Sequence, residues 1–153
     1  MTLEKTLDFH IKSTWHAITR MYNNIAYKYD ISQTIGYVLI NIGKEGTPAT
    51  KIAPLMGMEP TSLSRLLKNM EKKGLIYKKG DEEDKRVVRI YLTEEGVKKR
   101  KLAKETILNF NAKLMQVLSY EDIEHLVKVF DIIKKCVQSE VGELIQEVDD
   151  NSL

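Results

Sequence analysis

A stretch near the middle of the 153-residue chain carries side chains of the kind that contact nucleic acids. Along residues 60–73, apolar side chains recur at helical spacing, which predicts one buried helix face: Leu63, Leu66, Leu67 and Met70. The opposite and flanking positions hold hydroxyl groups, an amide and cations: Thr61, Ser62, Ser64, Arg65, Lys68, Asn69 and Lys72. Phosphates need positive charge and hydrogen-bond donors, and base edges need donors and acceptors. Because no acidic residue lies between Thr61 and Lys68, this face favours nucleic-acid contact over a solvated face of mixed charge.

Two further cations, Lys85 and Arg86, lie in a charged segment between two stretches of strand composition. Residues 75–79 and 87–92 are rich in β-branched and aromatic side chains, which predicts a pair of strands. The intervening segment is too long for a tight turn, so we expect a mobile loop that projects from the strands. Its four acidic residues, 81–84, must point away from a polyanion or weaken its binding.

The elements that position these residues are predicted to be a helix-turn-helix followed by the strand pair. A helix is expected over about residues 33–42, with Ser32 as its N-cap. Thr47 and Pro48 have the residue types of an N-cap and a first helical position, so a short helix should follow them. Its apolar residues, which are interrupted by Pro54, are Ile52, Ala53, Leu55 and Met56. After a turn at residues 57–59, the second helix of the pair would enter the DNA major groove, and the strands would form a wing.

Long helices are predicted on both sides of this unit. The first, over about residues 3–29, has apolar groups on two sides, which fits a helix that packs on its own domain and on a second subunit. Another is expected over about residues 94–118, and a last one begins after a capping box at Ser119 and Asp122. The last helix carries a long apolar stripe: Leu126, Val129, Phe130, Ile133, Val137, Val141 and Leu144. A stripe of this length exceeds what soluble monomers leave exposed, so we expect a second copy to cover it.

Four sequence pieces, in order and at characteristic spacings, resemble the MarR family of winged helix-turn-helix transcriptional regulators. They are residues 51–58, 62–67 and 70–76, and the wing with Asp84-Lys85-Arg86 followed by Leu92-Thr93-Glu94-Glu95-Gly96. The flanking helices also match the family layout, in which N- and C-terminal helices build a dimer interface. Pro54 and the acidic residues of the wing depart from the family pattern.

The resemblance assigns roles to particular residues. The family's wing-tip arginine falls on Arg86, which would enter the minor groove, and Asp84 would pair with it and shape the wing. The alternative for these two residues is a surface ion pair of little consequence. The family also places a ligand pocket between its DNA-binding and dimer regions. Candidates to line that pocket are Trp15, Ile18, Tyr22 and Tyr37, for which packing in the core is the favoured alternative.

Composition and charge narrow the classes of protein to which the chain can belong and the kinds of site that it can contain. The net charge of +2 divides into +1 for residues 1–46, +4 for residues 47–93, +3 for residues 94–118 and −6 for residues 119–153, which indicates a polyanion-binding centre and an acidic end. A single cysteine, Cys136, excludes an internal disulfide, and we expect it to be a buried small hydrophobe. The histidines, at 10, 16 and 125, have no metal-ligand spacing.

The sequence contains neither a glycine-rich phosphate loop nor a nucleophile elbow, so neither motif points to an enzyme. No apolar run approaches the ~18 residues of a membrane span, and the N-terminus lacks signal-peptide features, which predicts a cytoplasmic protein.

The sequence therefore predicts a mostly α fold, a winged helix-turn-helix with a small β-wing and helical dimerisation regions. The expected boundaries are 1–31 for an N-terminal dimerisation helix, 32–96 for the DNA-binding domain and 97–153 for C-terminal dimerisation helices. The expected function is that of a homodimeric, sequence-specific regulator, a repressor, that binds double-stranded DNA at a pseudo-palindromic operator and responds to a small molecule. No metal, cofactor or membrane partner is expected. The alternative is a winged helix used only for protein–protein contacts.

Overall fold

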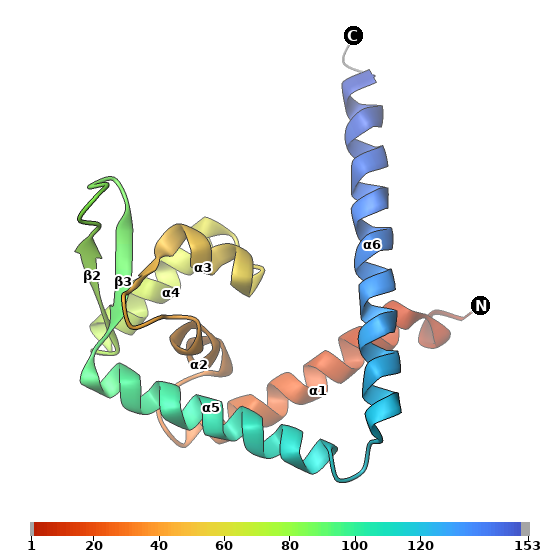
Figure 1. Ribbon diagram of the computed structural model, residues 1–153, viewed down its shortest axis with the longest axis horizontal. Helices are drawn as coiled ribbons and strands as arrows, with labels where there is room; N and C mark the ends of the chain where they lie inside the picture. Colours follow the sequence, from red (N-terminus) through yellow and green to blue (C-terminus); the bar gives the residue numbers. More distant parts are fainter. Residues whose placement is uncertain (1, 151–153) are drawn as a thin grey trace. The chain divides into compact units, whose positions relative to one another are not determined.

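The computed structural model describes residues 2–150, and it describes side chains as far as Val141. The elements are a 3-10 turn η1 (Leu3–Lys5), helix α1 (Leu7–Tyr27), helix α2 (Gln33–Ile40), strand β1 (Thr47–Pro48), helix α3 (Ala49–Met56), helix α4 (Pro60–Lys72), strands β2 (Ile76–Gly80) and β3 (Val88–Leu92), helix α5 (Glu94–Leu114) and helix α6 (Tyr120–Asp150) (Figure 1). This order confirms the predicted mostly helical fold with a small sheet after a pair of short helices. The chain divides into two compact units, with the boundary after Leu108. No helix of the described chain is long and apolar enough to cross a membrane.

The core of the first unit joins α2, α3, α4 and the sheet. Its buried side chains are Ile31, Ile35, Val38, Leu39, Ile42, Ile52, Ala53, Leu63, Leu67, Met70, Leu75, Ile76 and Ile90. Three of the four apolar residues predicted to face inward from α4 belong to this set, and Leu66 packs against it half-buried. Leu55, grouped with the apolar residues of the short helix, is instead exposed. A helix of eight residues buries only one side, and Ile52 and Ala53 already fill it.

The start of α3 differs from the prediction. Thr47 does not cap this helix, because Thr47 and Pro48 form β1, which pairs antiparallel with β3 through Thr47 opposite Ile90 and Pro48 opposite Arg89. The Thr47 hydroxyl accepts a hydrogen bond from the Gly43 amide at 3.0 Å and donates one to the Asn41 carbonyl at 3.2 Å. Pairing with a strand that lies forty residues later decides this conformation, and local residue types could not reveal it.

The helix-turn-helix consists of α3, a tight turn and α4. The turn requires Gly57, whose φ of 58° lies in the left-handed region that a side chain disfavours. The Met58 amide donates to the Ala53 carbonyl at 3.0 Å, which closes the turn. Pro54 lies on the exposed side of α3, and the helix ends two residues after it. Pro60 occupies the first turn of α4, where its missing amide hydrogen costs no helical hydrogen bond.

The sheet has the strand order β1-β3-β2, and all its pairings are antiparallel. Within β2 and β3, Ile76 pairs with Leu92 and Gly80 with Val88, so the hairpin loop spans residues 81–87. Tyr77 and Tyr91 lie opposite each other and stack with ring centroids 5.3 Å apart. Figure 1 shows the hairpin extending beyond α3 and α4, with its loop at the far end. The wing is thus a short sheet whose free end carries the charged loop.

The ends of α4 and α5 meet at a compact junction. The Thr93 hydroxyl donates to the Gly74 carbonyl at 2.6 Å and accepts from the Gly96 amide at 3.0 Å, while the Thr93 amide donates to the Leu75 carbonyl at 3.1 Å. A Cβ on Gly96 would lie 2.0 Å from the Leu75 carbonyl oxygen, so only glycine allows this approach. The residue that caps α5 therefore also holds the chain segment that leaves α4.

The corner between α1 and α2 is fixed from two distant parts of the sequence. Asp30 adopts a φ of 55°, a left-handed conformation that aspartate tolerates better than most residues. Lys73, at the end of α4, donates from Nζ to both the carboxylate and the carbonyl oxygen of Asp30, each at 3.1 Å. Lys99, in α5, donates to the Tyr29 carbonyl at 2.9 Å. The corner is thereby attached to both neighbouring helices.

The second unit contains the end of α5 and the 31-residue helix α6. Its predicted capping box is confirmed, since the Ser119 amide and hydroxyl donate to Asp122 at 2.8 and 2.7 Å, and the Asp122 amide donates back at 3.1 Å. The preceding helix ends at Leu114, four residues earlier than expected. Apolar residues of α6 that are exposed in the single chain include Leu126, Val127, Val129, Phe130, Ile132, Val137 and Val141. The predicted stripe also named Leu144, whose side chain lies outside the described residues.

The exposure of Cys136 differs from the prediction. This residue was expected to be buried, but it is exposed on α6. The apolar stripe beside it is exposed in the single chain, and none of the described residues buries Cys136 on the flank of that stripe.

Candidate nucleic-acid interface

The exposed face of α4 carries every residue that the sequence assigned to it. The helix buries Leu63, Leu67 and Met70 against the core. The predicted DNA-contacting residues are all exposed: Thr61, Ser62, Ser64, Arg65, Lys68, Asn69 and Lys72. Four of them, with Glu71, line a wide and open surface depression along the second half of the helix. The fold therefore presents hydroxyl, amide and cationic groups together on one accessible surface.

The positive charges on this face of α4 lack carboxylate partners, and such a face suits an anion. Within the described part of the chain, none of the ion pairs involves Arg65, Lys68 or Lys72. The one acidic residue near them, Glu71, is paired with Lys78 of β2 at 3.0 Å. The cations of α4 are thus uncompensated by carboxylates, and a polyanion would supply the missing counter-charge.

At the wing, Arg86 and Asp84 form the predicted pair. Arg86 donates from Nε to Asp84 at 3.1 Å and from Nη2 at 3.3 Å, and its backbone amide donates to the same carboxylate at 3.0 Å. These hydrogen bonds lower the pKa of Asp84 from its ordinary value. The Arg86 side chain is 92% exposed, and Lys85 beside it is also exposed. The pair is present, and insertion of Arg86 into a minor groove remains a prediction.

The acidic residues before these cations are mostly engaged within the wing. Glu82 pairs with Lys79 at 3.0 Å, and Asp81 pairs with Arg89. Hydrogen bonds from Arg89 and from the backbone amides of Asp84 and Glu83 lower the pKa of Asp81 to about 2. The expected mobility of the loop stays a prediction; in the structure, two backbone hydrogen bonds, from Asp81 to Val87 and from Val87 to Asp84, add to these contacts within the loop.

Sequence reasoning missed the pair of Asp81 and Arg89. The signal that could have found it is the hairpin register. Gly80 pairs with Val88 in an antiparallel ladder, so Asp81 lies opposite Val87, and Arg89, two residues along the strand from Val87, is its diagonal neighbour with opposite charge. Without the register, Arg89 is one of ten cations in the basic middle of the chain and Asp81 one of four consecutive acids.

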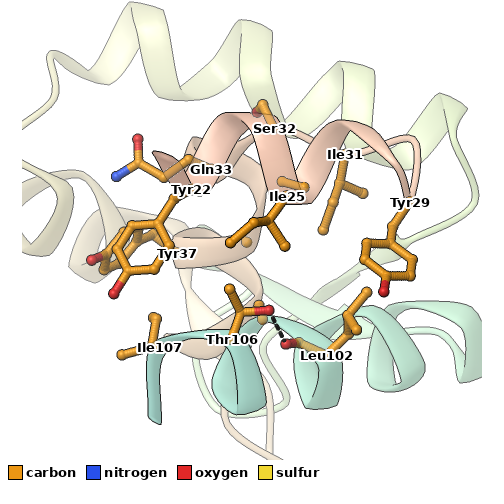
Figure 2. Close-up of a pocket in the computed structure, with 13 residues that line it drawn as sticks. Tyr22, Ile25, Tyr29, Ile31, Ser32, Gln33, Tyr37, Leu102, Thr106 and Ile107 are labelled. Atoms are coloured by element: carbon orange, nitrogen blue, oxygen red, sulfur yellow. Dashed lines mark hydrogen bonds between the residues drawn. The ribbon is translucent and has the colours of Figure 1, made fainter. Parts of the chain in front are cut away.

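The first unit also contains a small cavity that is partly open to solvent. Figure 2 shows Leu102, Thr106 and Ile107 of α5 on one side of it, facing residues of α1, α2 and the corner between them. Of the four predicted pocket residues, Tyr22 and Tyr37 line this cavity, whereas Trp15 and Ile18 do not. Trp15 lies nearer the start of α1, where it is exposed in the single chain.

The lining of the cavity consists of apolar and hydroxyl-bearing residues and the amide of Gln33, and none of its residues is charged. Burial raises the pKa of the Tyr22 phenol, and the nearby Tyr37 adds to this effect. Burial also raises the pKa of Tyr37, with a hydrogen bond to Gln33 opposing the shift. Both phenols are therefore protonated at neutral pH. In the part of the chain that the structure describes, no three His, Cys, Asp or Glu side chains gather to hold a metal ion.

Comparison with known proteins identifies similar chains. A family model described as the MarR family matches residues 37–88, which run from α2 to the first residue of β3. The organic hydroperoxide resistance transcriptional regulator of Bacillus subtilis is 30% identical over 129 residues, which cover 82% of this chain and 85% of that protein. The HTH-type transcriptional regulator SarZ of Staphylococcus aureus is 32% identical over 111 residues, covering 71% and 75%. A crystal structure of the S. aureus MepR–DNA complex matches the fold with a TM-score of 0.77 at 23% identity, covering 85% of this chain and 98% of MepR.

Proposed function

The chain belongs to the MarR family of transcriptional regulators, and we propose that it is a sequence-specific DNA-binding repressor that acts as a homodimer. In this proposal each α4 contacts the major groove of one half of a pseudo-palindromic operator, because a two-fold dimer presents identical surfaces to identical half-sites. Such a regulator acts where the DNA is, in the cytoplasm. The similarity of the fold to MepR, a protein solved as a DNA complex, supports the proposal.

The observation that carries the proposal is the uncompensated positive face of α4. Arg65, Lys68 and Lys72 form no ion pair with the described residues, although other cations of this unit, such as Lys73 and Lys78, are paired. A helix that served only solubility would gain nothing from segregating its cations in this way. Hydroxyl groups at Thr61, Ser62 and Ser64 complete a surface that matches phosphate oxygens and base edges.

The test is to sequence the genomic fragments that the purified protein retains, and then to measure affinity for the retained site. Affinity should fall steeply with salt, because phosphate contacts release counterions. Arg65→Ala should weaken binding, whereas Lys128→Ala removes the same charge from an exposed position of α6 and should leave affinity unchanged. Absence of retained sequence and of any salt dependence would refute DNA binding and favour a winged helix used for protein contacts.

The homodimer is supported by apolar surface that a single chain leaves open in each of its two units. In α1, Leu7 is 62% exposed and Trp15 is 50% exposed, with Phe9 and Ile11 also exposed. In α6, the seven exposed apolar residues named above occupy much of the helix surface. We expect a second copy to cover both surfaces in an obligate interface of more than ~2,000 Å² in total.

Sedimentation at micromolar concentration tests the dimer directly. The expected mass is twice the 17.6 kDa of one chain. Val137 is 56% exposed in the single chain, so Val137→Asp should leave the helix intact and dissociate the dimer. Gln138→Asp introduces the same residue at the next, also exposed, position and serves as the control. A monomeric parent chain would overturn the dimer and the two-site mechanism.

We further propose that the cavity binds a small, uncharged effector. No charged residue lines the cavity, so an ionised ligand would lose its hydration without gaining a counter-charge. The protonated phenol of Tyr37 can instead donate a hydrogen bond to a carbonyl or ether oxygen. Tyr29 and Ile31 line the cavity on either side of Asp30, which is bonded to Lys73 at the end of α4. A ligand that displaces this corner would thereby shift the DNA-contacting helix.

Neutral and anionic aromatic compounds of matched size test this part of the proposal. Neutral members should raise the melting temperature of the protein and lower its affinity for the retained DNA, since a ligand that binds the native state stabilises it. Tyr37→Phe should weaken their binding and leave DNA affinity unchanged. A preference for the anionic members would contradict the proposed ligand class.

A further inference from the structure

We infer that Asp81 and Arg89 form a lock that fixes the wing, and that Arg89 is a positioning residue for DNA binding and not itself a DNA-contacting cation. The inference rests on the proposed DNA-binding function, because it concerns how the wing is presented to DNA. We refer to the contacts of these two side chains with the wing loop and with residues 45–46 as the wing lock.

The Asp81 carboxylate is the centre of the loop side of the wing lock. Its Oδ1 accepts hydrogen bonds from the backbone amides of Glu83 at 2.9 Å and Asp84 at 3.1 Å, and its Oδ2 accepts from Nε of Arg89. The Asp81 side chain is 11% exposed, whereas that of Asp84 is 44% exposed. A shielded carboxylate with several donors is held far more firmly than an exposed ion pair.

Arg89 connects this loop to a second segment. Its Nη1 donates to the carbonyl of Gly46 at 3.2 Å and to that of Glu45 at 3.4 Å, in the turn that precedes β1. The backbone of Arg89 pairs with Pro48 of β1 at the same level of the sheet. One guanidinium therefore bridges the hairpin loop and the chain that leads into α3. Only the fork of an arginine offers donors in both directions from one planar group.

The wing lock determines where Arg86 lies. The amide of Asp84 is bonded to Asp81, and the carboxylate of Asp84 holds Arg86 in turn. The position of the exposed wing-tip cation thus depends on a series of contacts that begins at Arg89. Because two of the nitrogens of Arg89 already donate within the protein and Asp81 offsets its charge, Arg89 contributes to DNA binding through this series.

The direction in which one substitution changes DNA affinity separates this positioning role from simple electrostatics. Asp81→Asn removes a negative charge close to the proposed DNA surface, so electrostatics alone predicts tighter binding. The wing lock predicts that DNA binding becomes weaker by about five- to tenfold. The side-chain amide of asparagine is a poor partner for the guanidinium of Arg89, so the loop is no longer held in place. Glu83→Gln is the matched control, with the same charge change in the same loop at an exposed position, and it should bind as well as the parent or better.

Substitutions of Arg89 distinguish positioning from contact with phosphate. Arg89→Lys keeps the charge, so it would restore a phosphate contact but cannot bridge Asp81 and the Gly46 carbonyl. We expect Arg89→Lys to bind DNA as weakly as Arg89→Met, with the slope of log affinity against log salt unchanged in both. A slope reduced by about one unit in Arg89→Met and restored in Arg89→Lys would assign Arg89 to phosphate and overturn the inference.

Amide hydrogen exchange measured without DNA tests the wing lock independently of the proposed DNA-binding function. Residues 82–87 should exchange faster in Asp81→Asn and in both Arg89 variants, while the α4 amides keep the protection of the parent. Exchange in the loop equal to that of the parent would refute the lock. If the parent chain binds no DNA at any salt concentration, the proposed function and the positioning role both fail, and loop exchange alone then decides the lock.

Discussion

Replacing Thr93 with valine should destabilise the first unit measurably, because one hydroxyl serves both ends of the junction between α4 and α5. Valine has nearly the shape of threonine, so packing is preserved while two hydrogen bonds are lost, those with the Gly74 carbonyl at 2.6 Å and the Gly96 amide at 3.0 Å. Gly96 is buried, so its amide loses its partner without gaining full access to water. Loss of a threonine cap costs about 0.5–2 kcal/mol, and the second hydrogen bond adds about 0.5–1.5 kcal/mol.

The assay is urea unfolding at one fixed protein concentration, because the apparent stability of the proposed dimer would depend on concentration. The midpoint should fall by the equivalent of about 1–3 kcal/mol with an unchanged m-value, and the melting temperature by about 2–4 °C for each kcal/mol. Thr93→Ser keeps the hydroxyl and should retain most of the stability. If valine matched the parent, or if serine and valine were equally destabilising, the role assigned to the hydroxyl would be refuted.

Three further outcomes are expected. Lys68→Ala should lower DNA affinity and reduce the slope of log affinity against log salt by about one unit if Lys68 contacts phosphate; an unchanged affinity and slope would remove it from the interface. Arg86→Ala should weaken operator binding by about 1–3 kcal/mol if the contact is as good as a base contact, and equal affinity at the same salt would contradict the minor-groove role. Because Arg89 and two backbone amides lower the pKa of Asp81 to about 2, this carboxylate stabilises the folded state above about pH 4 and loses that effect as the pH falls toward 2, and the lowered pKa values of Asp84 and Asp122 act in the same direction. Thermal unfolding of Asp81→Asn should accordingly depend less on pH in that range than unfolding of the parent.

Local signals predicted those features that depend on neighbouring residues. Ser32 and the pair Ser119 and Asp122 cap their helices as expected, because a cap needs only a side chain and an amide three residues away. The exposed and buried sides of α4 follow from its helical period for the same reason. The pairing of Asp84 with Arg86 was also accessible, since it joins residues two positions apart.

Features that depend on distant segments were missed or misjudged. Thr47 has the residue type of a helix cap, yet β3 recruits it into the sheet. The wing lock needs the hairpin register, which composition does not give. Trp15 and Ile18 share helical spacing with Tyr22, but only the later part of α1 reaches the cavity. The exposure of Cys136 depends on whether a second chain covers α6, and the sequence of one chain does not contain that information.

The corner at Asp30 has a consequence for the order in which the chain acquires its structure. Its left-handed backbone is secured by Lys73, forty-three residues later, and its neighbour Tyr29 by Lys99, seventy residues later. Contacts over such sequence separations form slowly, since the intervening chain must first be brought together. During synthesis, α1 can pack on α2 early, since the Gln33 amide donates to Asn23 at 2.9 Å, but the corner at Asp30 lacks both lysine contacts until α4 and then the start of α5 have left the ribosome. The corner between α1 and α2 is therefore completed only after the helix-turn-helix and the hairpin have been synthesised.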